Sequence, residues 1–315
     1  MKRIFTALAI TSSLVLTQAC ASQVKSSQTR ETSTSNTNAI ADANSHAGHN
    51  MDHSKTLGTK ENSHVGHNMG NDHNEHSGHS NLEPANAIAE LTLPTSIVPK
   101  TPVSLTIDIK DKNGKSIANF DQFQEKLMHL IVVSDDLQSF QHIHPTYKNN
   151  GRFEVQTDFP YPSNYTLFSD YKVAGKAEQV SILKAQVPGQ SPTTPKIDLA
   201  TTKTFGNTKV NLKLPQPTIK AGQEIHVIFN LQDTDTNKSP TDLKPYLGER
   251  GHLVILKQSS PLTQADYIHA HAMKNTPNDE IHFMTSFPKA GKYKMWGQFN
   301  RNGKIITADF WIDVQ

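Results

Sequence analysis

The chain has 315 residues, enough for two domains of ordinary size that each bury their own core. Its formal net charge of +2 is close to balance, which excludes the strongly basic surface typical of nucleic-acid-binding proteins. Histidine is unusually frequent, with 16 residues, whereas a single cysteine leaves no partner for a disulfide within the chain. Stability must therefore come from the burial of apolar side chains.

Residues 1–20, MKRIFTALAITSSLVLTQAC, begin with basic residues and continue with an apolar run of signal-peptide length, too short for a membrane span. A small residue, Ala19, precedes Cys20. The segment resembles the signal of bacterial lipoproteins, in which the peptide is cut before a cysteine that then carries the lipid. We expect a signal peptide over residues 1–19 and a lipid anchor on Cys20. If Cys20 is not lipidated, we expect secretion instead.

Residues 20–83 contain few large apolar side chains and many Ser, Asn, Thr, Gly and His residues, so burial cannot offset the entropy lost on folding. We expect a disordered tether. Within it SHAGHNM recurs as SHVGHNM, and DHNEHSGH follows. Imidazole suits Cu(II), Zn(II) and Ni(II), and the methionine thioether suits Cu(I). The candidate ligands in this tail are His46, His49, Met51, His53, His64, His67, Met69, His73, His76 and His79. The alternative is a solvated low-complexity tail whose histidines bind nothing.

After the tail, apolar and polar residues alternate over short stretches, as in half-buried strands. VSLTIDIKD at 103–111 has a counterpart in IHVIFNLQD at 225–233, and YTLFSDY at 165–171 has one in YKMWGQF at 293–299. The two series keep the same order along the chain, which indicates an internal duplication.

Each half has about seven short strands separated by turn residues, and no stretch has the pattern of a long amphipathic helix. We therefore predict an all-β fold of two tandem homologous β-sandwich domains at residues 84–187 and 201–315, joined by a linker at 188–200. Immunoglobulin-like and cupredoxin-like topologies both remain open.

Each half also contains a His-x-His pair, in FQHIHP at 140–145 and YIHAHA at 267–272. Because side chains alternate along a strand, both histidines of a pair face the same side. A third histidine lies in the preceding strand of each half, HLIVV at 129–133 and HLVIL at 252–256.

A hairpin would bring the third histidine to its pair. A tight turn at Asp135–Asp136 would place His129 opposite His142 and Ile131 opposite Phe140. The second hairpin is four residues longer, an even number that keeps the same face, and would turn near Ser260–Pro261. It would place His252 opposite His269 and Val254 opposite Tyr267.

The sequence thus predicts three imidazoles at cross-strand distance in each half, a set suited to one metal ion. The candidate ligands are His129, His142 and His144 in the first half, and His252, His269 and His271 in the second, with Met273 as a further soft ligand. The alternative is that these histidines are hydrogen-bonded structural residues. His226 and His282 occupy polar-face positions, and we expect them to bind no metal.

The segment MHLIVVSDDLQSFQHIHP resembles a segment of bacterial envelope proteins with YtkA-like or cupredoxin-like β-sandwich domains, several of which handle copper or other heavy metals. The resemblance covers residues 86–315 and implies that His129, His142 and His144 are ligands. Neither half has the cysteine ligand of an electron-transferring blue-copper centre. We therefore expect no such centre.

These observations predict a lipid-anchored protein of the cell envelope, facing the periplasm or the surface, that binds copper for sequestration, resistance or delivery. Zinc and nickel are the other candidate ions. The expected partners are metal ions, the membrane and a metal efflux or delivery protein, without nucleic acid, and we predict no enzymatic activity.

Two other functions remain open. A structural or adhesive tandem β-sandwich lipoprotein would leave the histidines incidental. FQHIHP also resembles the copper-binding strand of copper-zinc superoxide dismutases, but the chain lacks a recognisable zinc loop and the cysteine pair of that family's disulfide.

Overall fold

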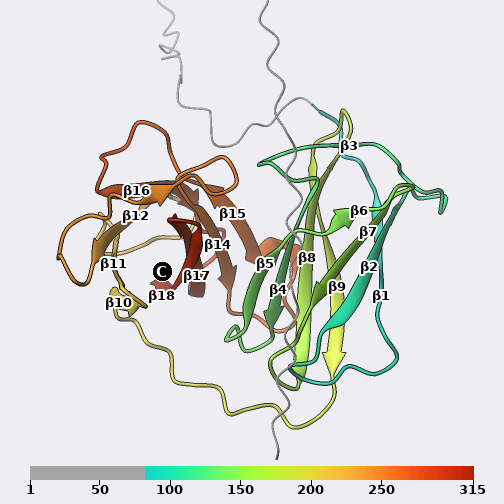
Figure 1. Ribbon diagram of the computed structural model, residues 1–315, viewed down its shortest axis with the longest axis horizontal. Helices are drawn as coiled ribbons and strands as arrows, with labels where there is room; N and C mark the ends of the chain where they lie inside the picture. The colour runs from blue at the N-terminus through green and yellow to red at the C-terminus, as the bar shows by residue number, and fades with distance from the viewer. Residues whose placement is uncertain (1–81) are drawn as a thin grey trace, which may run out of the picture. The chain divides into compact units, whose positions relative to one another are not determined.

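The computed structural model describes residues 82–315, which form an all-β fold of two repeated β-sandwich domains (Figure 1). The predicted fold class is confirmed. The expected signal peptide, Cys20 and all the candidate ligands of the tail lie outside the described residues. Within residues 82–315, no helix is long and apolar enough to cross a membrane.

The first repeat contains nine strands in two antiparallel sheets. They are β1 (Ile88–Thr92), β2 (Val103–Lys110), β3 (Phe120–Asp121), β4 (Met128–Ser134), β5 (Phe140–Ile143), β6 (Thr146–Tyr147), β7 (Arg152–Thr157), β8 (Ser163–Val173) and β9 (Glu178–Val187). One sheet has the order β1-β2-β7-β6, and the other has the order β3-β8-β4-β5 with β9 also paired to β8.

The second repeat also contains nine strands, with one 3₁₀ turn, η1. They are β10 (Thr202–Phe205), β11 (Thr208–Lys213), β12 (Glu224–Asp233), β13 (Leu243–Lys244), β14 (His252–Lys257), η1 (Gln264–Asp266), β15 (Tyr267–His271), β16 (Glu280–Ser286), β17 (Gly291–Arg301) and β18 (Lys304–Val314). Its sheets are β10-β11-β12-β16 and β13-β17-β14-β15, with β18 paired to β17.

This strand order is that of an immunoglobulin-like sandwich. In the first repeat, β1-β2-β7-β6 corresponds to the A-B-E-D sheet, and β5-β4-β8-β9 corresponds to the C′-C-F-G sheet. In the second repeat, β11-β12-β16 and β15-β14-β17-β18 repeat the arrangement. The topology that the sequence left open is therefore immunoglobulin-like in both repeats.

The A-B-E sheets follow the alternation read from the sequence. In β2 the side chains of Val103, Leu105, Ile107 and Ile109 are buried in the core of the first repeat. Polar residues between them face outward. Each repeat therefore has its own sandwich core, built from alternate positions of its strands.

The central strands of the C′-C-F-G sheets, β4 and β8 in the first repeat and β14 and β17 in the second, are buried on both faces. In β4, Leu130 and Val132 belong to the core of the first repeat, whereas Ile131 and Val133 belong to a third core shared by both repeats. The shared core is formed by Ile131, Val133, Leu137, Phe168, Val254, Leu256, Leu262, Trp296 and Trp311. The outer faces of these two sheets therefore cover each other, as the neighbouring ribbons of β4–β5 and β14–β15 indicate (Figure 1).

Two aromatic stacks join the repeats in a reciprocal way. The ring of Phe140 stacks on Trp296 at a centroid distance of 4.6 Å, and the ring of Tyr267 stacks on Phe168 at 4.7 Å. Phe140 and Tyr267 hold equivalent positions in the two repeats, as do Phe168 and Trp296. The same aromatic contact is therefore made twice between the repeats, once from each C′ strand to the F strand of the other repeat.

The predicted hairpin register is wrong by two residues in both repeats. In the first, His142 lies opposite Ile131 and Phe140 lies opposite Val133. The chain does not turn tightly at Asp135–Asp136. Instead, β4 continues to Ser134, and a longer turn follows in which Leu137 has a left-handed backbone with φ of 57°.

The second hairpin has the same offset, with His269 opposite Val254, and Tyr267 opposite Leu256. Because side chains alternate along a strand, a shift of two residues leaves every side chain on its predicted face. The histidines therefore keep the face that the sequence predicted, although their cross-strand partners differ.

The shared core can be tested with Trp296→Ala. Loss of the buried indole and of its stack on Phe140 is expected to lower the free energy of unfolding by about 3–5 kcal/mol. Chemical denaturation of the full chain measures the change. The exposed residue Val98 provides the control, since Val98→Ala is expected to change stability by less than about 0.5 kcal/mol. A loss below about 1 kcal/mol for Trp296→Ala would contradict a shared core.

Candidate metal centre

The structure brings together the three predicted histidines of each repeat. His129 comes near the start of β4, His142 lies in β5, and His144 follows two residues later, so all three project from the same face of the sheet. We call His129, His142 and His144 the first triad. In this group one ring nitrogen from each residue lies within 4.8 Å of the others.

The second triad consists of His252, His269 and His271 and has the same construction. His252 is the first residue of β14, and the other two lie in β15. One ring nitrogen from each again lies within 4.8 Å of the others. The ring centroids are 4.9–5.3 Å apart in the first triad and 4.9–5.5 Å apart in the second.

The nitrogen spacing in both triads suits a shared ion. Nδ1 of His129 is 3.0 Å from Nε2 of His142, and Nδ1 of His252 is 3.3 Å from Nε2 of His269. Two nitrogens bound tetrahedrally to one ion, with metal–nitrogen bonds of about 2.0–2.1 Å, lie roughly 3.3–3.4 Å apart. The paired nitrogens therefore already stand close to the separation that two ligands of one ion require.

Hydrogen bonds and burial leave lone pairs available in the first triad. Nε2 of His129 donates to the carbonyl oxygen of Phe123 at 3.3 Å, which leaves Nδ1 as the unprotonated nitrogen that faces His142. Nε2 of His144 is buried and has no hydrogen-bond partner among the described residues. A buried nitrogen without a partner is costly unless something else coordinates it.

Burial also keeps the imidazoles of His129, His142, His144, His252 and His269 neutral. Desolvation is the largest cause in every case, and repulsion from neighbouring imidazoles adds to it for His129, His144 and His252. The pKa of His129 falls to about 3, that of His142 to about 4, and those of His144 and His252 to about 2. The pKa of His269 is also far below its ordinary value. Neutral imidazole is the form that binds a metal ion.

Two residues that sequence reasoning missed orient these ligands. Oε1 of Gln298 accepts from Nδ1 of His142 at 2.7 Å, and Oδ2 of Asp170 lies 3.1 Å from Nδ1 of His269. Both contacts run from one repeat to the other. A signal was present, because the aligned strands YTLFSDY and YKMWGQF carry Asp170 and Gln298 at the same position. They lie opposite His129 and His252 in their own sheets.

Asp170 is fully buried, and its pKa is raised well above its ordinary value. Desolvation is the main cause, with a smaller contribution from Glu178. A cation bound to the imidazole of His269 would favour the ionised carboxylate.

The two triads are next to each other. The ring of His129 lies 6.3 Å from that of His252 and 5.7 Å from that of His269. The ring of His142 lies 5.9 Å and 5.7 Å from the same two rings. The sequence predicted two separate sites, and the structure places all six histidines in one cluster where the repeats meet.

A turn of the first repeat reaches the second triad as well. Gln124 and Glu125 both have left-handed backbones, with φ of 47° and 64°, and form the tip of the turn between Phe123 and Lys126. The side-chain amide of Gln124 contacts both ring nitrogens of His271. This amide would have to rotate before both of those nitrogens became accessible.

The remaining predicted ligand, Met273, and the two histidines expected to bind no metal, His226 and His282, are not part of either triad. Met273 follows the end of β15, and its backbone N–H donates to the carbonyl of His282 in β16 at 2.8 Å, so its place as a ligand stays a prediction. His282 pairs with Glu280 at 2.8 Å, and its ring lies 6.3 Å from that of His226. Both histidines lie on the outward face of the β12–β16 pair, as expected.

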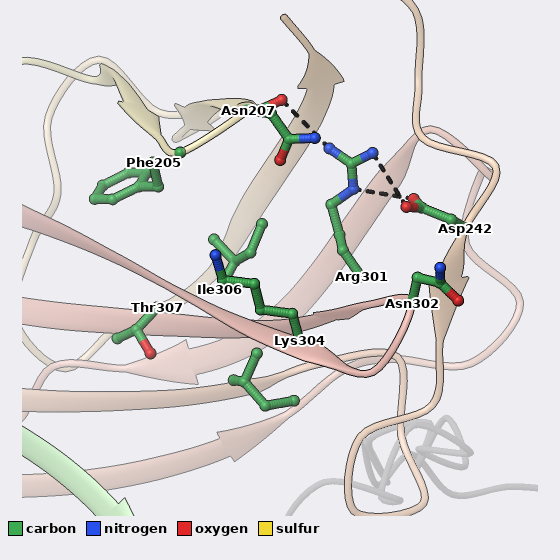
Figure 2. A pocket seen from close by; sticks show the side chains of 10 residues that line it. Phe205, Asn207, Asp242, Arg301, Asn302, Lys304, Ile306 and Thr307 are labelled. Atoms are coloured by element: carbon green, nitrogen blue, oxygen red, sulfur yellow. Dashed lines mark hydrogen bonds and ion pairs between the residues drawn. The ribbon is translucent and has the colours of Figure 1, made fainter. Parts of the chain in front are cut away.

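A surface pocket of the second repeat offers a weaker candidate site (Figure 2). Arg301 in its lining forms ion pairs with Asp242 at 2.9 Å and Asp233 at 3.0 Å. The guanidinium is therefore already neutralised, and the structure gives no further reason to place a ligand there.

Comparisons with solved structures return β-rich proteins at low similarity. The FdeC adhesin of Escherichia coli is 13% identical over 74% of this chain, with a TM-score of 0.24. MtrC of Shewanella baltica is 7% identical over 72%, with a TM-score of 0.23, and a Salmonella alpha-2-macroglobulin mutant is 11% identical over 74%, with a TM-score of 0.25. The chain spans 65%, 69% and 15% of these three proteins. Such TM-scores support no argument about function.

No curated protein matches the sequence. One family model matches twice, at residues 86–187 and 203–315, and so includes both repeats and both triads. The chain therefore belongs to the family described as Domain of unknown function (DUF8832).

Proposed function

We propose that this protein binds transition-metal ions, copper foremost, at its two histidine triads. The observation that carries the proposal is that each triad brings three imidazoles together around a buried histidine, with ring nitrogens within 4.8 Å of one another and one nitrogen pair 3.0 or 3.3 Å apart. Three protein nitrogens around one ion leave a fourth position open for exchange or transfer.

Ligand chemistry favours copper. Imidazole suits copper, zinc and nickel, and copper stands at the top of the affinity order for divalent ions. The triads contain no thiolate, so the proposed site captures or passes on an ion without the chemistry of a blue-copper centre. Zinc and nickel are the competing ions, and metal analysis of protein matured with all three supplied distinguishes them.

We also propose a place in the cell for this binding. The first 20 residues support export and lipid attachment at Cys20, and the histidines and methionines of residues 46–79 support a low-specificity collector. In this scheme the collector takes up ions near the membrane, and the triads hold them for sequestration or for delivery to an efflux or carrier protein.

Replacing a ligand should remove one ion. In the full chain, His142→Ala and His269→Ala are each expected to lower the copper content by one equivalent, because two remaining imidazoles form an incomplete shell. Metal analysis of the purified protein measures the loss. The matched control is His282→Ala, which changes a histidine outside both triads and should leave the copper content unchanged.

The opposite result would assign these histidines a structural role. If His142→Ala and His269→Ala destabilise the fold while the copper content stays at the wild-type value, the triads are packed hydrogen-bonded residues. Ile143→Ala separates the two effects, because Ile143 packs against the core of the first repeat and should change stability with little change in copper content.

Deleting the collector should distinguish the copper that it binds from the copper that the triads bind. A chain lacking residues 21–81 is expected to keep the β circular-dichroism spectrum, since the three cores are built from residues between Ala87 and Val314. Its copper content should fall to about two equivalents, one for each triad. An unchanged total would contradict the collector, and a total near zero would contradict the triads.

Acid should destabilise the metal-free protein. The pKa of His129 is about 3 and that of His142 about 4 in the folded state, against roughly 6.5 when unfolded. Between these values the unfolded chain binds more protons. The stability present above pH 6.5 is therefore lost as the pH falls toward 4, by up to about 1.4 kcal/mol per pH unit for each such histidine.

The measurement is the Tm of the metal-free full chain from pH 7.5 to 5. A steep fall is expected for the wild type, and a shallower fall is expected when His129, His142 and His144 are all changed to Gln. Parallel profiles for the two proteins would contradict burial of neutral imidazoles. The same low pKa values predict that the first triad keeps copper at pH 5.5, whereas histidines of ordinary pKa lose it.

A further inference from the structure

We propose that the two triads form one two-ion centre, in which each repeat positions a ligand of the other and the two ions occupy unequal sites. This inference rests on the proposed metal binding and adds to it the coupling of the sites and the residues that set their difference. The positioning residues are Asp170 and Gln298.

The spacing of the rings argues for a single centre. Between the triads, the four rings of His129, His142, His252 and His269 are 5.7–6.3 Å apart. Within the triads, ring centroids are 4.9–5.5 Å apart. The separation between rings of different triads is therefore only slightly larger than the separation within a triad, so two ions bound in the triads would be near neighbours. Two cations at such a distance in a buried setting affect each other's binding.

Each triad depends on the other repeat for the orientation of one ligand. Gln298 in β17 fixes the ring of His142, and Asp170 in β8 fixes the ring of His269. Because each contact engages Nδ1, each ring points Nε2 toward its own triad, at 3.0 Å from His129 or 3.3 Å from His252. A hydrogen-bonded partner on the remote nitrogen of a metal-bound histidine is the usual way in which a protein fixes that ring.

The two positioning residues are not equivalent. A carboxylate on the remote nitrogen makes an imidazole a more basic ligand and offsets the charge of the ion, whereas an amide oxygen offers a neutral dipole. Asp170 therefore favours the second triad as the site that fills first and holds its ion more tightly. The first triad, oriented by Gln298, becomes the weaker and exchangeable site, since its ion also meets the charge of the ion already bound.

This division suits an ion carrier. The retained ion in the second triad joins the two repeats, because its ligands come from the second repeat and the positioning residue Asp170 comes from the first. The exchangeable ion in the first triad is the one released to an acceptor. The roles follow from the difference between Asp170 and Gln298 at the same place in the duplicated strand.

Electron paramagnetic resonance of the full chain loaded with Cu(II) tests the shared centre. A half-field signal arises only from two Cu(II) ions a few ångström apart, and we expect it in the wild type at saturation. His144→Gln and His271→Gln should each abolish this signal and remove one copper equivalent. His282→Gln should retain both the signal and the copper content. Residues 1–81 are the same in all four proteins, so the differences report on the triads.

The outcomes separate the two proposals. If each triad variant loses one copper ion but the wild type has no half-field signal, or the signal persists in the variants, then the triads bind separately and only the shared centre is overturned. If neither variant loses copper, both the shared centre and the proposed function are overturned.

A second measurement tests positioning across the repeats. In the His144→Gln background, which leaves the second triad, Asp170→Asn is expected to weaken Cu(II) binding about 10–100-fold in competition with a chelator. In the His271→Gln background, which leaves the first triad, Gln298→Glu should strengthen it. His282→Gln in each background is the control and should leave the affinity unchanged. Unchanged affinities with a folded circular-dichroism spectrum would show that Asp170 and Gln298 only fill space, and would overturn their role.

Discussion

The structure depends on the burial of two sheet faces against each other. An immunoglobulin-like sandwich needs only its inner faces for its own core, yet the C′-C-F-G sheets of this chain bury their outer faces as well, around Ile131, Val133, Val254 and Trp296. The reciprocal aromatic stacks follow from this contact. So does the reduced solvent exposure of the six histidines, which lie on the same faces and are buried or half-buried where the repeats meet.

Burying imidazoles where the repeats meet costs free energy if they bind no ligand. A buried polar group costs free energy unless it is hydrogen-bonded, and Nε2 of His144 has no partner among residues 82–315. The short contacts between His129 and His142 and between His252 and His269 bring nitrogen to nitrogen, where an apolar pair would pack at lower cost. Binding of an ion would satisfy these nitrogens together, which is the simplest account of why both repeats retain the arrangement.

Much of this organisation could be predicted from the sequence, because successive side chains of a strand point to opposite faces of the sheet. The duplication, the strand faces and the grouping of His142 with His144 follow from alternation, which survives a shift of two residues. The register itself could not be predicted, because it depends on the turn around Leu137, whose left-handed backbone no pattern signals.

Alternation predicts which face of a sheet a histidine occupies, but it does not predict which part of the protein covers that face. The unbroken apolar runs of β4 and β14, typical of strands buried on both faces, were the available sign. The roles of Asp170 and Gln298 depend on the same contact between the repeats and became visible only with it.

The most direct test of metal binding at the triads is a crystal structure of the copper-loaded protein, with anomalous difference maps recorded at the copper absorption edge. We predict two anomalous peaks, one within about 2.0–2.1 Å of nitrogens from His129, His142 and His144, and one at the same distance from nitrogens of His252, His269 and His271. Maps with no peak at either triad, from crystals of copper-saturated protein, would contradict the account.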